Sequence, residues 1–101
     1  MPEVVLLAGA EADSLDIFMR LESRNPDAAD GFLRRLDDCL SRISLHPESA
    51  PTFVGKCRRL VMRGFPFGIF IVEESARVFV QAILDLRQSP ENIRRRLGLE
   101  L

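Results

Sequence analysis

The stretch that decides the fold runs Arg58-Arg-Leu-Val-Met-Arg-Gly-Phe-Pro-Phe-Gly-Ile-Phe-Ile-Val72. Its first six residues alternate, so that Leu60 and Met62 face one side of a strand and the residues beside them face the other. Gly64 then turns the chain. Residues 65–72 are almost wholly apolar, as expected for a strand in the interior of a sheet. The stretch therefore predicts two consecutive strands of one sheet.

The chain that follows predicts one more strand and a short helix. Glu73-Glu-Ser75 is expected to form a turn, and Arg77–Leu84 a third strand. Ser89 then supplies an N-cap, Pro90 suits the first helical position, and a short basic helix is expected over Glu91–Leu97.

The chain that precedes the stretch predicts a strand and two helices. Glu3–Ala8 is rich in aliphatic residues and reads as a short strand that Gly9 breaks. A first helix is expected over Glu11–Arg24. Asn25 is a good N-cap for a second helix, which His46-Pro47 ends because a residue before proline avoids the helical region.

The apolar residues of the two helices indicate which faces are buried. In the first helix, Leu15, Phe18, Met19 and Glu22 mark successive turns, Leu21 is also available to the core, and Asp13, Asp16 and Arg20 are expected to face water. In the second helix, the apolar stripe is Ala29, Phe32, Leu33, Leu36, Leu40 and Ile43. The short connection predicts an antiparallel hairpin, and residues 47–55 are expected to form a loop.

These elements give the order β-α-α-β-β-β-α in one α+β domain over residues 1–101. The helical hairpin should cover one face of a small sheet. The three later strands should form an antiparallel meander, with the first strand at an edge.

Composition excludes several classes of protein. The chain has 101 residues, 47% hydrophobic and 29% charged, which suits a globular fold. No apolar run approaches the roughly 20 residues of a membrane span, and no basic residues precede Val4–Ala8, so we expect a cytoplasmic protein without membrane association.

Cys39 and Cys57 form no CxxC motif, and Cys39 is expected to be a buried thiol. No metal or cofactor is expected, since the glycines form no phosphate-binding loop.

Charge is distributed unevenly along the chain. Up to Ala50 there are five basic and ten acidic residues, whereas beyond it there are nine basic and five acidic residues. Such asymmetry suggests an anionic partner for the second half, although chance segregation on a mixed surface would look the same.

The order and spacing of these motifs resemble those of the RelE/ParE toxin superfamily. The strongest match is the stretch 58–72, an arginine-bearing strand followed by a Phe-Pro-aromatic triplet and an apolar strand. Val78–Arg87 followed by Ser89-Pro90 is the second match. Asn25–Phe32 and Leu45–Pro47 are similar to the start and end of the family's second helix. The resemblance covers nearly the whole chain and implies a type II toxin–antitoxin protein.

The ParE-like branch implies a toxin that binds and poisons DNA gyrase, a role in plasmid stabilisation or stress, and no catalytic residue. Its anionic contact surface would come from the basic strands and the C-terminal arginines. The target-binding candidates are Arg58, Arg59, Arg63, Arg87, Arg94, Arg95 and Arg96. The last three also suit a solvated C-terminal turn favoured by the helix dipole.

The RelE-like alternative implies a ribosome-dependent nuclease that cuts messenger RNA. Such cleavage needs an acid, a base and cations. The chain contains no tyrosine, Asp85 stands at the usual histidine position, and Gln88 replaces a second arginine. The candidates are Asp85 as base with Arg59 and Arg87. The plainer interpretation of Asp85 is a salt-bridge partner for Arg87 or a neighbouring arginine.

Either toxin would pair with a cognate antitoxin protein in a hetero-oligomer. An exposed sheet edge and an apolar helical hairpin suit an extended or helical partner segment. The antitoxin-binding candidates are Leu15, Phe18, Met19 and Leu21, which otherwise complete the core. A third alternative is an inactive member that binds only its antitoxin.

Overall fold

The computed structural model describes residues 2–99. Along the chain lie β1 (Glu3–Leu6), α1 (Ala8–Arg24), α2 (Pro26–Leu45), the 3₁₀ helix η1 (Pro47–Ser49), β2 (Thr52–Val54), β3 (Cys57–Val61), β4 (Phe67–Glu74), β5 (Arg77–Asp85) and α3 (Pro90–Arg96). The expected α+β class and the expected order of the main elements are confirmed.

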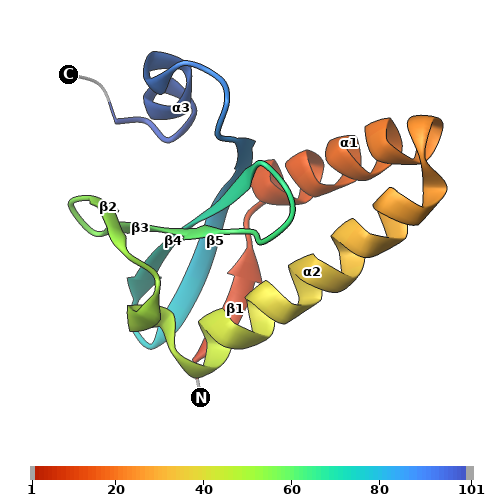
Figure 1. Ribbon diagram of the computed structural model, residues 1–101. Coiled ribbons are helices and arrows are strands. Elements are labelled where there is room, and N and C mark those ends of the chain that lie inside the picture. The colour runs from red at the N-terminus through yellow and green to blue at the C-terminus, as the bar shows by residue number, and fades with distance from the viewer. Residues whose placement is uncertain (1, 100–101) are drawn as a thin grey trace.

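One five-stranded sheet has the strand order β1-β5-β4-β3-β2 (Figure 1). The antiparallel meander of β3, β4 and β5 forms its centre, as the stretch 58–72 predicted. The first strand lies at an edge, as predicted, and pairs there with β5 in parallel.

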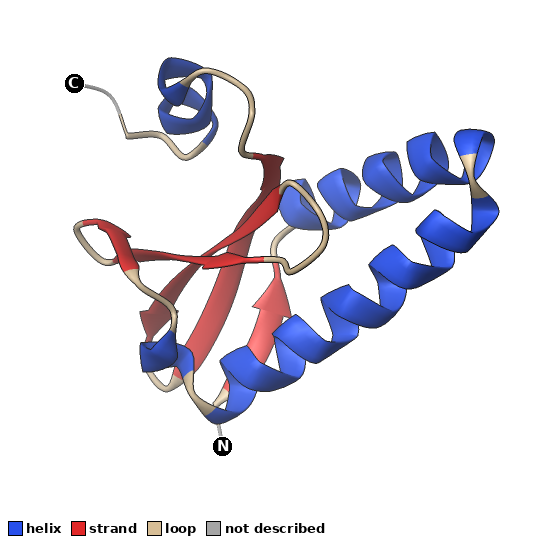
Figure 2. Cartoon of the chain, viewed as in Figure 1, coloured by secondary structure: helices blue, strands red, loops and turns tan. Residues whose placement is uncertain are grey.

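The helices α1 and α2 form an antiparallel hairpin whose tip projects beyond the sheet (Figure 2). The tip is stabilised by Asn25, whose Oδ1 accepts hydrogen bonds from the backbone N–H groups of Asp27 at 3.1 Å and Ala28 at 3.3 Å. This N-cap satisfies donors that the first turn of a helix otherwise leaves free. The expected cap and the expected end at His46 are both confirmed.

The sheet buries a separate apolar cluster on each face. The larger cluster lies between the hairpin and the sheet and includes Phe32, Ile43, Met62, Ile69 and Val80. The smaller one lies on the opposite face, where Ile93 of α3 covers Cys57, Phe70 and Ala82. A sheet covered on both faces explains why β4 is apolar without alternation.

Three predicted boundaries were wrong. Gly9 does not end β1 but lies in the first turn of α1, which begins at Ala8. The expected loop 47–55 contains η1 and β2, and Thr52 of β2 pairs with Arg58. The turn after β4 is formed by Ser75 and Ala76, both with positive φ, so β4 extends to Glu74. The last two differences reflect pairing with the next strand along the chain, β3 for β2 and β5 for β4, which local propensity does not show.

Two helical faces also differ from prediction. Leu33 is 43% exposed, and Cys39 takes its place in the buried stripe of α2, which confirms the buried thiol. Asp13 of α1, expected to face water, has a side chain only 14% exposed. Within residues 2–99 no helix is both long and apolar enough to cross a bilayer.

Candidate functional site

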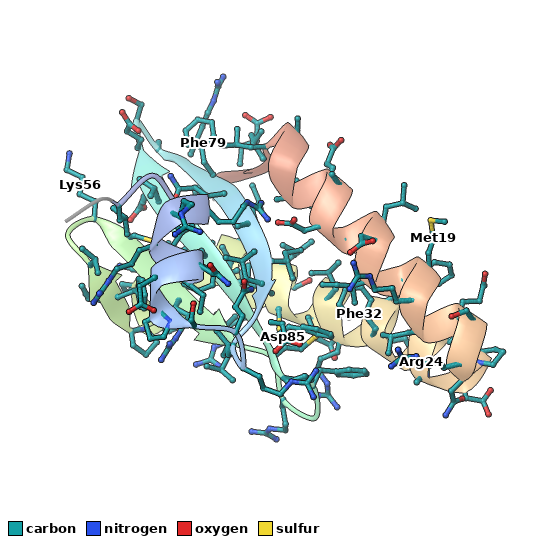
Figure 3. The ribbon with its side chains drawn as sticks, turned by 90° about the horizontal axis from the view of Figure 1, so that it is seen from above. Met19, Arg24, Phe32, Lys56, Phe79 and Asp85 are labelled. Atoms are coloured by element: carbon teal, nitrogen blue, oxygen red, sulfur yellow. The ribbon has the colours of Figure 1, made fainter. Side chains whose placement is uncertain are left out.

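A charged cleft of about 320 Å³ lies between α1 and the C-terminal end of β5. Figure 3 shows Asp85 at this end of the sheet and Arg24 further along α1. The apolar part of the cleft lining includes Phe67 and Ile83. The charged groups that line it are Asp13, Asp16, Asp85, Arg20, Arg24, Arg87 and Arg96. The structure thus gathers two of the predicted arginines with four charged residues of α1.

Asp13 connects three elements from its position on α1. Its Oδ2 accepts a hydrogen bond from the backbone N–H of Ile83 at 3.0 Å. Its two oxygens also accept from the Nη1 and Nη2 of Arg96, both at 2.9 Å. A carboxylate that receives a backbone donor and a bidentate guanidinium is strongly held. Asp13 therefore joins α1 to both β5 and α3, a role that sequence reasoning missed.

Asp85 and Arg87 form a closed pair at the end of β5. Arg87 donates from Nε to Oδ1 at 3.0 Å and from Nη2 to Oδ2 at 2.7 Å, and its backbone N–H donates to Oδ1 at 2.8 Å. The hydrogen bond from the Arg87 side chain holds the pKa of Asp85 below its ordinary value. A lowered pKa makes a carboxylate a weaker base, so the arrangement favours the salt-bridge interpretation.

Arg59, the remaining nuclease candidate, does not line this cleft. It lies in β3 with its guanidinium carbon 5.4 Å from the centre of the Phe53 ring. Its stem packs over Gly68 of β4, where an added Cβ would lie 3.3 Å from the Cγ and Cδ of Arg59 and 2.8 Å from the Cδ2 of Leu86. The three nuclease candidates therefore do not converge on one cleft.

The other arginine candidates have different surroundings. Arg58 donates to the carbonyl oxygens of Ala50 at 2.8 Å and Glu48 at 3.3 Å, and so secures the segment before β2. Arg95 donates to the Oδ1 of Asn92 at 3.1 Å. Arg94 is half-buried on α3, while Arg63 is exposed in the turn between β3 and β4. Two of these four arginines are therefore engaged by groups of the chain itself.

The four antitoxin-binding candidates divide into two pairs. Phe18 and Leu21 pack against the larger core cluster, whereas Leu15 and Met19 are 60% and 59% exposed. Figure 3 shows Met19 pointing away from the body of the molecule. Leu15 also borders an apolar groove of about 310 Å³ together with Leu6, Phe18 and Leu33. Part of the hairpin is therefore apolar and uncovered.

Residues 2–99 offer few groups suited to histidine-based catalysis or to metal binding. His46 lies at the end of α2, exposed, with Nδ1 3.6 Å from the Oε1 of Glu48. Within residues 2–99 no cluster of three or more histidine, cysteine, aspartate or glutamate residues is arranged to hold a metal ion.

Comparison with known proteins gives one informative result. No protein-family model matches the sequence, and no curated protein matches it. Among solved structures, the chain is similar to one from the chromosomal ParDE TA system of P. aeruginosa, with a TM-score of 0.76, 15% sequence identity, and coverage of 86% of this chain and 98% of that chain. The ParE-like fold that the sequence resemblance implied is thereby confirmed, and the chain has the fold of a ParDE-system protein.

Proposed function

We propose that this chain is the toxin of a type II toxin–antitoxin pair, that it acts in the cytoplasm by binding DNA gyrase, and that a cognate antitoxin neutralises it. The observation that carries the proposal is the extent of the shared fold, which spans 98% of a chain from a ParDE TA system. Because a likeness in fold does not by itself establish function, two features of the site add to it.

The first feature favours binding over catalysis. The carboxylate best placed to act as a base, Asp85, is closed into a bidentate pair with Arg87 and has a lowered pKa. Arg59 lies outside the cleft that holds that pair. A binder of gyrase needs no acid or base, so this arrangement leaves its action intact.

The second feature is a surface suited to an antitoxin. Exposed Leu15 and Leu33 line an apolar groove on the hairpin. Met19, which is also exposed, lies one turn beyond Leu15 on α1. Beside the groove, β1 forms the end of the sheet. An amphipathic helix would bury its apolar side chains in the groove, and an extended segment would pair with the edge of β1. We assign this surface to the antitoxin.

Induced expression of the chain alone, with a DNA-damage reporter in the same cells, tests the toxin. We expect growth arrest with a strong damage signal, and inhibition of supercoiling when purified protein is added to gyrase. Arrest with cleaved messenger RNA and no damage signal would instead indicate a nuclease. Unimpaired growth together with unaffected supercoiling would contradict the proposal and leave a chain that at most binds an antitoxin.

Paired substitutions test the antitoxin surface. The double variant Leu15→Ser and Met19→Ser should fold normally, because both side chains are already exposed, yet should lose rescue by the cognate antitoxin. Leu45→Ser is the matched control, since Leu45 is 55% exposed at the other end of the hairpin. Equal rescue of both variants would remove the assignment.

A further inference from the structure

A second pocket, of about 180 Å³, lies between α2 and the β3–β4 turn, away from the charged cleft. Arg35 and Arg42 come from α2, and Arg63 comes from the turn. Cys39 and Leu60, both buried, contribute to the lining. Asp38 is the one carboxylate among the lining residues.

The positive charge in this pocket is not neutralised. The charged cleft contains three arginine–aspartate salt bridges, but no salt bridge found in residues 2–99 includes Arg35, Arg42 or Arg63. Three guanidinium groups against one carboxylate leave a formal surplus of two positive charges. Such a surplus around a concave surface attracts a small dianion.

A side-chain contact positions one of the three guanidinium groups, and a hydrogen bond fixes the backbone turn that carries another. Arg42 donates from Nε to the Oγ of Ser49 at 3.2 Å, and Ser49 donates in turn to the carbonyl oxygen of His46 at 2.7 Å. The turn that carries Arg63 is closed by a hydrogen bond from Phe65 N–H to Met62 O at 3.3 Å. These contacts lower the entropic cost of binding a ligand.

The turn itself is fastened to α2. Gly64 has a φ of 84°, which glycine adopts without strain at the third position of a β-turn. Phe65 then packs edge-on against Phe32 of α2, with ring centres 6.0 Å apart, and stacks on Phe67 at 6.1 Å. The aromatic trio therefore keeps Arg63 on the side of the sheet where Arg35 and Arg42 lie.

We propose that Arg35, Arg42 and Arg63 bind a phosphate group, either free phosphate or a phosphodiester of a nucleic acid. Guanidinium groups offer paired N–H donors that match the oxygens of a phosphate. The pocket is smaller than the roughly 300–1,000 Å³ of pockets that enclose organic ligands, so one phosphate fits and its carrier lies outside. This site is independent of the proposed toxin activity.

A titration of the purified protein with inorganic phosphate, followed by ¹⁵N NMR, tests the site. Sodium chloride keeps the ionic strength constant, so that the screening of charges does not change. Inorganic phosphate should shift the amide signals of Arg35, Cys39, Arg42 and Arg63. Each of Arg35→Gln, Arg42→Gln and Arg63→Gln should weaken binding by about tenfold. Arg34→Gln is the matched control, because Arg34 is exposed on the same helix and does not line the pocket.

A change of opposite sign sharpens the test. Asp38→Asn removes the one carboxylate of the pocket and should tighten phosphate binding, by about twofold to tenfold at ordinary ionic strength. A short DNA oligonucleotide distinguishes the sources of phosphate: binding tighter than that of phosphate, lost in the same variants, identifies a phosphodiester, and otherwise the ligand is the free ion.

Alkylation of Cys39 gives a second readout. Burial raises the pKa of Cys39, while Arg35 and Arg42 act to lower it. A bound phosphate should offset these two charges and slow alkylation of Cys39, but not of Cys57 on the opposite face of the sheet. The proposal is overturned if phosphate shifts none of these signals, if Arg34→Gln weakens binding as much as the pocket variants, or if a glutamate peptide binds more tightly than phosphate.

Discussion

The charged cleft beside α1 and the arginine pocket beside α2 contain similar residues in opposite states. In the cleft, Arg20, Arg87 and Arg96 are each paired with an aspartate. In the pocket, the guanidinium groups of Arg35, Arg42 and Arg63 meet a single carboxylate from the lining, that of Asp38. In the cleft, one of these pairs, Asp13–Arg96, also joins α1 to α3, whereas the proposed phosphate site depends on arginines that form no salt bridge within residues 2–99.

The difference shows that the sequence alone does not reveal which arginines are paired within the fold. Of seven arginines expected to contact a target, two are engaged by aspartates and one by backbone carbonyl oxygens. Two arginines of the pocket, Arg35 and Arg42, come from the acidic half of the chain. What matters is which carboxylates the fold brings beside each guanidinium group.

The largest expected effect that separates the two regions is on stability. Asp13→Ala removes the acceptor for Ile83 N–H and leaves Arg96 unpaired, so the free energy of unfolding should fall by about 3 kcal/mol. Asp16→Ala breaks only an exposed pair with Arg20 and should cost less than about 0.5 kcal/mol. Urea unfolding of both variants provides the measurement, and equal losses would contradict a connecting role for Asp13.

A smaller effect is expected from Phe65→Ala, which should change both the stability of the fold and phosphate binding at the arginine pocket. Phe65→Ala should lower the free energy of unfolding by about 1–2 kcal/mol, because it removes two aromatic contacts. It should also weaken phosphate binding nearly as much as Arg63→Gln, because the turn is then free to move. Unchanged phosphate binding in a folded Phe65→Ala protein would show that the aromatic trio does not position Arg63.

The smallest effect concerns pH. Since the pKa of Asp85 is lowered by Arg87, the pair stabilises the fold fully above the ordinary carboxyl pKa, about 3.9, and less as pH falls through the lowered value. Arg87→Gln should therefore cost little stability at neutral pH, because the pair is largely exposed. The stabilities of the wild-type protein and of Arg87→Gln should converge once pH falls below that lowered pKa. A difference in the free energy of unfolding that grows on acidification would contradict a stabilising ion pair between Asp85 and Arg87.

The sequence by itself determined most of the fold. The alternation in residues 58–63, the apolar stretch after Gly64, and the caps Asn25 and Ser89 each act within a few residues, so they specified strands, turns and helix ends locally. Their order was sufficient to indicate the ParE-like fold. Leu15 and Met19, which are exposed, were two of the four residues of the first helix that the sequence offered to an antitoxin.

Only the tertiary structure decided the sites. Asp13 meets Ile83 and Arg96 across 70 and 83 residues of chain, and β2 forms because Thr52 lies beside Arg58. Arg63 comes to Arg35 and Arg42 through aromatic packing between the β3–β4 turn and α2. Charges act through distance in space, and the distances between residues far apart in sequence are fixed only when the elements pack together.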